Sequence, residues 1–370
     1  MPIKILSDIV DVVSEHISNP GTSGFEIFVG LEHYDSGDPL ITRYGSTNNL
    51  ASSVKHFVSG DILVARRNVY LRRAGVVRFE GVTSGDSIVL RVKDKEYSDI
   101  LPFILNSDDF WDYAEQNSDG TMSKRLAPDV LLEYECNIPD NHYQIANKLW
   151  AAHRLKESYK RLLAATDEMV KSQFIEMFGG CANRIKLSSL CSTFVDGDWI
   201  ESKDQSELGI RLIQTGNVGN GFFKDKEDKS RYISEETFDN LHCTEIYPGD
   251  ILVSRLPDPI GRACIIPQGI GRTITAVDCT IIRLKDIILP DYFIAYTMTP
   301  SYAAQINEVT TGTTRRRVSR ANLGNILIPC PSIAKQQQFV AIAKQADKSK
   351  FELRKSIDAI DQVIKSLING

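Results

Sequence analysis

Apolar residues recur every three or four positions along two long stretches of the chain, which is the pattern of a helix with one apolar face. Each stretch predicts a helix of about 38 residues, and therefore about 57 Å in length. The apolar seam predicted for the first helix comprises Ala152, Leu155, Tyr159, Leu162, Thr166, Met169 and Gln173. The seam predicted for the second helix comprises Ile342, Ala346, Ser349, Leu353, Ser356, Ile360, Val363 and Leu367.

The two predicted helices match in length and have small residues in their seams. Each helix could lie on its own domain, but the matching lengths favour pairing with each other as a long antiparallel two-helix coiled coil. Gly179 and Gly180 predict the end of the first helix, because glycine readily takes the positive φ of a C-terminal cap. Such a coiled coil would hold two globular domains at a fixed separation.

The remaining segments contain short apolar runs broken by Gly, Pro, Asn and Asp. Runs of this length predict strands over 62–65, 76–79, 88–90 and 251–253, whereas 103–115 and 292–309 have helical patterns. The glycine-rich segment 216–221 lacks the G-x-G-x-x-G spacing of a dinucleotide site and predicts a turn. The sequence therefore predicts a mixed α/β fold.

The second half of the chain repeats the first. The segment 60–66 recurs as 249–255, and 86–94 recurs as 278–286. Shorter matches follow in the same order at nearly constant spacing, among them Gly120-Thr121 with Gly312-Thr313 and Ile138-Pro139 with Ile328-Pro329. Ordered matches of this kind indicate a tandem duplication with pseudo-twofold character. The predicted divisions are a first domain over 1–139, a helix over 140–180, a second domain over 181–331 and a helix over 332–370.

The composition is that of an ordinary globular protein and excludes few classes of function. The chain is 42% hydrophobic and 25% charged, and its net charge of −5 means that any surface for nucleic acid must be local. Seven scattered cysteines predict reduced thiols, and no signal peptide or membrane-length apolar run is evident, so a cytoplasmic location and no membrane contact are expected.

Sequence motifs for catalysis are missing. The chain has no G-x-x-x-x-G-K-[ST] phosphate loop and no Asn-Pro-Pro-Tyr or Asp-Pro-Pro-Tyr tetrapeptide, and its six histidines have no metal-ligand spacing. The expectation is a non-catalytic chain without a metal or cofactor of its own. A catalytic cluster that forms only in space stays open at this stage.

Basic residues cluster at corresponding places in the two copies. Arginine forks match phosphate oxygens and can also read guanine, and Asn and Tyr are common beside them in DNA-binding surfaces. The alternative is solvated surface paired with acidic side chains, and recurrence in both copies favours DNA binding. The predicted DNA-binding residues are Arg66, Arg67, Asn68, Tyr70, Arg72, Arg73, Lys124, Arg125, Arg255, Arg262, Thr314, Arg315, Arg316 and Arg317. Asp61 and Asp250 are expected to be turn or cap residues.

The segment Gly312-Thr313-Thr314-Arg315-Arg316-Arg317-Val318, with Ile328-Pro329-Cys330-Pro331 and Gln336-Gln337-Gln338-Phe339-Val340, resembles the end of a target-recognition domain in specificity subunits of type I restriction-modification systems. Val29-Gly30-Leu31-Glu32-His33 is also similar to a segment of their first domains, and the duplication and helix placement match over the whole chain. The first copy departs from the pattern, with Gly-Thr-Met-Ser-Lys-Arg-Leu at 120–126 and no glutamine run after Pro139.

The resemblance implies two target-recognition domains that bind the halves of a bipartite double-stranded DNA site, separated by the coiled coil. It implies docking of two methyltransferase subunits on the helices. The residues expected in helix–helix contact or partner docking are Leu155, Tyr159, Leu162, Met169, Ile342, Leu353, Ile360, Val363 and Leu367. Motor-nuclease subunits would complete the complex, and SAM, ATP and magnesium would act on those partners. Two alternatives are a single-chain DNA-modifying or DNA-cleaving enzyme subunit and a protein-only scaffold.

Overall fold

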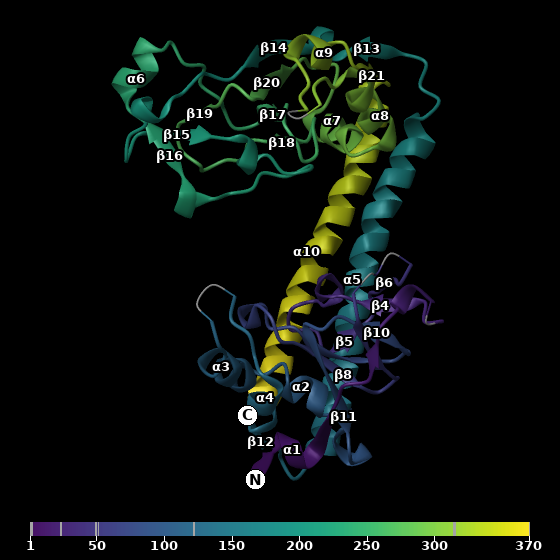
Figure 1. Ribbon diagram of the computed structural model, residues 1–370. Coiled ribbons are helices and arrows are strands. Elements are labelled where there is room, and N and C mark those ends of the chain that lie inside the picture. The colour runs from purple at the N-terminus through teal and green to yellow at the C-terminus, as the bar shows by residue number, and fades with distance from the viewer. Residues whose placement is uncertain are drawn as a thin grey trace. The chain divides into compact units, whose positions relative to one another are not determined.

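The structure is a computed structural model that describes residues 3–22, 24–48, 50, 52–120, 123–313 and 316–369 (Figure 1). The chain divides into two compact units. Unit 1 comprises Met1–Arg161 with Leu353–Gly370, and unit 2 comprises Leu162–Glu352. Two long helices, α5 (His142–Phe178) and α10 (Ile333–Asn369), each contribute one part to each unit. The mixed α/β fold predicted from the sequence is confirmed.

Unit 1 contains two five-stranded sheets, with strand orders β3-β7-β10-β4-β6 and β2-β11-β8-β9-β5, and the pair β1-β12. Its strands are β1 (Ile3–Ile5), β2 (Val10–Val13), β3 (His16–Ile17), β4 (Ile27–Val29), β5 (Leu40–Ile41), β6 (Gly45–Ser46), β7 (Val54–Phe57), β8 (Ile62–Ala65), β9 (Ala74–Val77), β10 (Gly81–Thr83), β11 (Ser87–Val92) and β12 (Glu135–Asn137). Its short helices are α1 (Leu6–Ile9), α2 (Leu101–Ile104), α3 (Asp108–Gln116) and α4 (Pro128–Leu132), with 3-10 turns η1 (Pro20–Thr22), η2 (Leu31–His33), η3 (Val69–Leu71) and η4 (Lys95–Tyr97).

Unit 2 contains the sheets β14-β20-β17-β18 and β16-β15-β19 and the pair β13-β21. Its strands are β13 (Arg184–Lys186), β14 (Cys191–Asp196), β15 (Ile210–Ile213), β16 (Arg231–Ile233), β17 (Ile251–Ser254), β18 (Ala263–Ile265), β19 (Thr273–Thr275), β20 (Cys279–Leu284) and β21 (Leu327–Pro329). Its short helices are α6 (Glu235–Asn240), α7 (Pro290–Thr297), α8 (Pro300–Val309) and α9 (Arg320–Gly324), with 3-10 turns η5 (Leu187–Leu190), η6 (Ser202–Asp204), η7 (Thr215–Asn217) and η8 (Glu227–Lys229).

Strand β8 shows why the repeated apolar run is buried on both sides. Successive side chains of a strand point to opposite faces of the sheet. Ile62 and Val64 accordingly join the main core of unit 1, which includes α2 and α3, whereas Leu63 and Ala65 join a second core on the other face. Strand β17 repeats the arrangement in unit 2. A run without polar alternation is therefore the pattern of a central strand between two packed layers.

The duplication extends to individual hydrogen bonds. The amide of Leu6 donates to Tyr134 O at 2.8 Å in unit 1, and the amide of Leu187 donates to Ile326 O at 2.9 Å in unit 2. Strands β10 and β4 pair in parallel, as do β19 and β15. The two halves are therefore two copies of one framework.

The repeated Gly-Asp pair is structural. Gly60 and Gly249 have φ values of 99° and 95°, a region that favours glycine. The Asp61 carboxylate accepts from the Val58 amide at 2.9 Å and from Arg91 at 2.8 and 2.7 Å. Asp250 repeats these contacts with the Tyr247 amide and Arg283. The prediction of turn residues is confirmed.

Two predicted helices are each broken in two. The stretch 103–115 forms α2 and α3, because Ser107 accepts from the Phe110 amide at 3.1 Å and caps a new helix. The stretch 292–309 forms α7 and α8, where Thr299 caps the second helix and Pro300 is its first residue. Helical periodicity alone did not reveal these caps.

In each unit, the early part of one long helix packs against the late part of the other, so the two segments run antiparallel. In unit 1, Lys156 pairs with Asp361 at 2.5 Å, and in unit 2, Lys350 pairs with Asp167 at 2.8 Å. Helix α5 ends at Phe178, immediately before the predicted Gly179-Gly180 terminus. Among the described residues, no helix is both long and apolar enough to cross a membrane.

Half of the seam predicted for α5 is displaced by one position. Ala152, Tyr159, Thr166 and Gln173 are partly buried as predicted, but at the other positions the partly buried residues are Lys156, Leu163 and Val170. Leu155, Leu162 and Met169 are 45%, 50% and 50% exposed, whereas Val170, the residue after Met169, packs on the core of unit 2. Polar residues occupy part of the seam, where Lys156 and Asp167 make their ion pairs to α10. Apolar counting excludes Lys156 and cannot separate Leu162 from Leu163 or Met169 from Val170, which is the source of the error.

On α10 the prediction is correct in part. Leu367 packs on the main core of unit 1, but Val363 is 53% exposed and its neighbour Ile364 packs on that core instead. The other predicted contact residues are partly buried: Tyr159, Ile342, Leu353 and Ile360.

Candidate nucleic-acid interface

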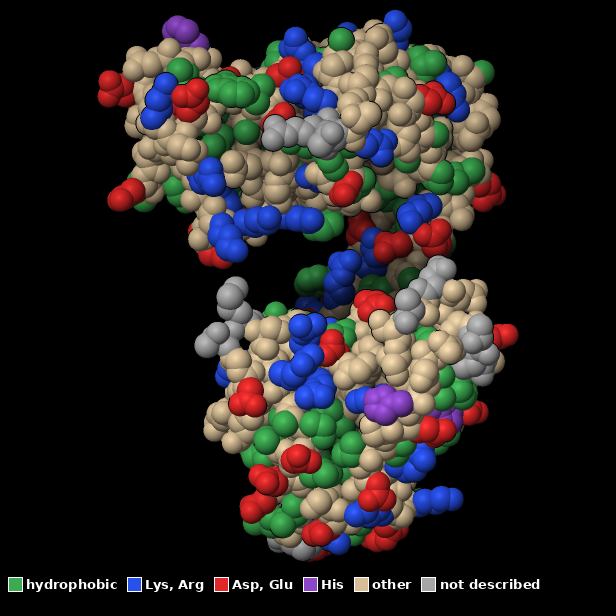
Figure 2. Space-filling view, viewed as in Figure 1, with side chains coloured by type: hydrophobic (Ala, Val, Ile, Leu, Met, Phe, Trp, Pro, Cys, Tyr) green, Lys and Arg blue, Asp and Glu red, His purple; other side chains and the backbone are tan. Residues whose placement is uncertain are grey.

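Unit 1 gathers four cationic side chains around one carboxylate. Arg66 and Arg67 follow β8, and Arg125 lies on a hairpin that is joined to them by the Leu126 amide, which donates to Arg66 O at 2.8 Å. Asp86 accepts from Arg125 at 2.7 Å and from Arg67 at 3.4 Å. Lys55 on β7 donates to Ser87 O at 2.8 Å. Figure 2 shows Lys and Arg side chains gathered on the face of this unit.

This cluster carries an excess of positive charge. Burial lowers the pKa of the Arg66 guanidinium, and the charge of Arg125 lowers it further. Burial and the charge of Arg66 likewise lower the pKa of Lys55, against a smaller opposite effect of Asp86. The Arg66 Nε atom is buried without a hydrogen-bond partner. An incoming phosphate would relieve the repulsion among these cations, which is the electrostatic basis of DNA affinity.

The corresponding arginines of unit 2 have different surroundings. The Val318 amide donates to Arg255 O at 3.2 Å, so Arg255 occupies the place of Arg66. Its side chain is 3% exposed, donates to Val277 O at 2.6 Å and lies 3.5 Å from Asp196. The structure thus gives Arg255 a buried structural position, unlike the DNA contact predicted from the sequence.

The arginine run of unit 2 lies on a hairpin in which Thr311 pairs with Arg317. Arg316 and Arg317 are exposed, at the places that Lys124 and Arg125 occupy in unit 1. Thr314 and Arg315, also predicted to bind DNA, lie outside the described residues. The Lys124 ammonium donates to Glu115 O at 2.6 Å, which makes Lys124 partly structural.

The predicted residues 68–73 have unequal roles. Tyr70 is 58% exposed at the tip of η3. Arg72 pairs with Asp108 at 2.5 Å and Asp112 at 3.2 Å on α3, which holds its guanidinium against the protein. Asn68 accepts from the Ser123 hydroxyl at 2.9 Å. Tyr70 is therefore the member of this group that is most available to a ligand.

Arg73 and Arg262 donate to backbone carbonyls. Arg262 is 7% exposed and donates to the carbonyls of Val218, Thr215, Leu256 and Pro259 at 2.7 to 3.0 Å. Arg73 donates to Leu31 O at 2.9 Å and Arg67 O at 3.1 Å. The donors of Arg262, a residue predicted to bind DNA, are therefore already occupied by the protein.

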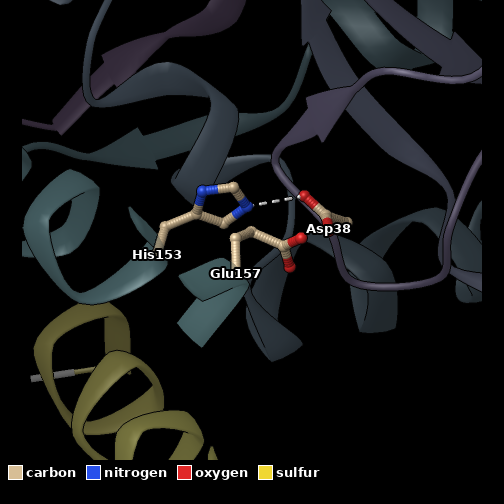
Figure 3. Close-up of side chains that lie close together, drawn as sticks. All are labelled: Asp38, His153 and Glu157. Carbon is tan, nitrogen blue, oxygen red and sulfur yellow. Dashed lines mark hydrogen bonds and ion pairs between the residues drawn. The ribbon is translucent and has the colours of Figure 1, made fainter. Parts of the chain in front are cut away.

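One group of described residues has the composition of a metal site: Asp38, His153 and Glu157, whose ligand atoms lie within 4.8 Å of one another (Figure 3). His153 Nε2 and Asp38 Oδ1 are 2.9 Å apart, and the Lys160 ammonium lies 2.7 Å from Glu157 Oε1. Burial raises the pKa of Asp38, but hydrogen bonds from His153 and the Leu40 amide outweigh burial and lower it. Since Lys160 already supplies a cation, the group fits a structural link between the segment before β5 and helix α5.

Sequence reasoning missed three residues of these clusters. Lys55 lies on a strand that was not predicted, and Asp196 had no signal because only folding brings β14 beside Arg255. Asp86 stands in the repeated segment 86–94, and its recurrence as Asp278 was the signal that could have identified it.

Comparison with known proteins agrees with the family resemblance found in the sequence. Residues 185–362 match the family described as "Type I restriction modification DNA specificity domain". No curated protein matches the chain in sequence. The fold is similar to a chain from a structure titled as the basis of complex assembly and conformational transition of the type I R-M system, with a TM-score of 0.61, 17% identity and coverage of 100% of this chain and 96% of that one.

The fold is also similar to the S subunit of a type I restriction-modification system from M. genitalium, with a TM-score of 0.55, 13% identity and coverage of 99% of this chain and 94% of that one. At these identities the likeness concerns the fold, and the sequence match concerns the second half of the chain. Residues 185–362 thus match the specificity domain of type I restriction-modification systems by sequence, and the whole chain shares the fold of a type I S subunit.

Proposed function

We propose that this chain is the non-catalytic DNA-reading subunit of its complex and that each unit binds one half of a bipartite double-stranded target. The observation that carries the proposal is one framework, built twice, with different side chains at its loops. Asp196 lies 3.5 Å from Arg255 in unit 2, whereas Arg66 in unit 1 shares the single carboxylate of Asp86 with other cations. The two copies therefore present different charges to DNA and would read different sequences.

The long helices are proposed to set the gap between the two half-sites and to dock two methyltransferase subunits. Leu155, Leu162 and Met169 support docking. They are seven residues apart, which places them on one face of α5, and each is about half exposed. An uncovered apolar stripe of this kind is a common feature of protein-binding surfaces. Motor-nuclease subunits, and SAM, ATP and magnesium bound by the partners, complete the proposal.

Methylation mapping tests the function directly. The chain is produced with its cognate methyltransferase subunit, and methylated adenines are mapped across the host genome. The expected result is a split motif with a gap of constant length, which is lost when this chain is omitted. A continuous motif, or methylation independent of this chain, would overturn the proposal. Cleavage or methylation of DNA by the purified chain alone would favour the enzyme alternative.

A salt titration tests the basic loops. The double substitution Arg316→Gln with Arg317→Gln should weaken binding to DNA. It should also reduce the slope of log affinity against log salt by about one for each phosphate that the protein no longer neutralises. Lys344→Gln is a matched control, because Lys344 is exposed on α10 and pairs with Asp291. A wild-type chain with no steep salt dependence would instead favour a protein-only scaffold.

A further inference from the structure

The duplicated arginines, Arg73 and Arg262, make the same contacts in both units. Each donates to the first carbonyl of a 3-10 turn: Arg73 to Leu31 O at 2.9 Å and Arg262 to Thr215 O at 2.8 Å. Each also donates to a carbonyl just beyond the repeated strand, on Arg67 at 3.1 Å and Leu256 at 2.8 Å. Each guanidinium therefore joins two loops that are distant in the sequence.

The 3-10 turns on the far side of this contact are also equivalent. In η2 the Gly30 amide donates to His33 Nδ1 at 2.9 Å, and in η7 the Gln214 amide donates to Asn217 Oδ1 at 3.0 Å. Different side chains thus cap the same turn. Retention of this geometry despite different residues indicates that the position of the loops is what the framework maintains.

In unit 1, the loop held by Arg73 presents Tyr70. Asn68 and Arg72 flank η3 with φ values of 54° and 48°, a conformation that costs free energy for residues other than glycine. Ion pairs of Arg72 with α3 and the hydrogen bond between Ser123 and Asn68 hold this conformation. At its tip the Tyr70 side chain is 58% exposed, within electrostatic range of Arg73.

In unit 2, the loop held by Arg262 presents Phe222. Arg262 Nε donates to Val218 O at 2.7 Å, at the base of a turn closed by pairing of Val218 with Phe223. The Gly219 amide donates to Phe222 O at 2.9 Å. The Phe222 side chain is 57% exposed, and the Lys224 ammonium lies 5.7 Å from its ring centroid.

We propose that Tyr70 and Phe222 are the aromatic contacts of units 1 and 2 with double-stranded DNA, and that Arg73 and Arg262 are positioning residues that fix the loops bearing them. The proposal rests on the proposed function. A rigidly held aromatic ring can pack against sugars and base edges in a groove, and cations beside it attract the flanking phosphates. Rigid presentation matters because a mobile ring would lose conformational entropy on binding.

The two aromatic residues lie on different sides of the duplicated arginine. Tyr70 is on the loop that follows the repeated strand β8, whereas Phe222 is on the loop that follows η7. The rings therefore project from different points of a common framework. This difference gives the two units distinct contacts with DNA and accounts for two unlike half-sites.

The test compares single substitutions in the methylation map. Tyr70→Ala should relax base discrimination in one half of the split motif by about tenfold, and Phe222→Ala should do the same in the other half only. Ile287→Ala is the control, because Ile287 is 47% exposed beside the start of α10, where its carbonyl accepts from Gln336. It should leave both halves unchanged.

The positioning role has its own readout. Arg262→Gln should relax the same half-site as Phe222→Ala and should also speed amide hydrogen exchange over 215–223. Phe222→Ala should leave that exchange unchanged. If Arg262→Gln unfolds unit 2, Arg262→Lys retains the charge while removing the fork of donors and serves instead.

The outcomes separate the two proposals. If the wild-type chain directs no split motif, the proposed function fails. If the wild-type motif is split but Phe222→Ala and Tyr70→Ala leave both halves as sharp as before, the function stands and this inference is overturned. Relaxation of both halves by either single substitution would also overturn it, because each aromatic residue is assigned to one unit.

Discussion

Replacing Asp61 with asparagine removes a charge from a nearly closed environment and should destabilise unit 1. The Asp61 side chain is 2% exposed and accepts three hydrogen bonds, two from Arg91 and one from the Val58 amide. Asparagine keeps the shape and one acceptor oxygen but loses the charge and the second acceptor. A hydrogen bond between charged groups contributes about 1.5–3 kcal/mol to stability.

The solvent exposure of Arg91 determines where within that range the loss of stability should fall. The Arg91 side chain is 42% exposed, so water can solvate the donors that Asp61 releases. We therefore expect Asp61→Asn to lower the free energy of unfolding by about 1.5–2 kcal/mol. Asp61→Ala also leaves the Val58 amide without its acceptor and should cost about 3 kcal/mol.

Urea denaturation followed by tryptophan fluorescence measures this loss, since Trp111 is 1% exposed in the core of unit 1. Hydrogen exchange locates it: Asp61→Asn should speed exchange in β8 but not in β17. Asp250→Asn, which alters the same contacts in unit 2, should have the reverse pattern and a similar magnitude. A loss below about 0.5 kcal/mol for both variants would refute the assigned role, because surface substitutions cost no more than that.

Three further results are expected. Burial lowers the pKa of His56, but its ion pairs with two glutamates outweigh burial and raise the pKa above 6.5. The protonated His56 therefore stabilises the fold fully below pH 6.5, and this stabilisation is lost as pH rises through the raised pKa. His56→Gln should make the urea midpoint less dependent on pH between pH 6 and 9. Cys181 should react first with a thiol reagent, since the six other cysteines are buried, and labelling of several thiols at equal rates would contradict the burial. The double variant Asp167→Cys with Lys350→Cys should cross-link within one chain through a short bismaleimide. The control pair, Glu168→Cys with Lys350→Cys, should not cross-link. Equal cross-link yields for the two pairs by mass spectrometry would argue against the observed register of α5 and α10.

Local sequence patterns predicted the elements whose surroundings are uniform. Strands β8 and β17 are buried on both faces, so their unbroken apolar runs identified them directly. The two long helices were equally clear, because periodicity persists over many turns. Every second position of their seam on α5 was assigned one residue early, because apolar counting excludes Lys156 and cannot separate adjacent apolar residues such as Met169 and Val170.

In the basic loops, too, the sequence predicted some features and only the structure revealed others. The recurrence of arginines identified the right segments, but not which guanidinium groups are free. Arg66 and Arg255 are equivalent in sequence, yet only the second has its own carboxylate, Asp196 on another strand, at 3.5 Å, whereas the first shares Asp86 with other cations. Arg262 and Tyr70 both belonged to the predicted set, and the structure buries the first while exposing the second. Phe222, which follows the segment 216–221 predicted as a turn, had no signal in a single sequence.

The sequence by itself determined the duplication, the mixed α/β class, the two long helices and the resemblance to specificity subunits, because periodicity and recurrence are properties of the order of residues along the chain. Only the tertiary structure decided which charged groups are neutralised and which side chains remain exposed. Those outcomes depend on contacts such as Arg262 with Thr215 and Asp86 with Arg125, between residues far apart in the chain. A carboxylate a few ångströms away changes the availability of an arginine, and folding sets that distance.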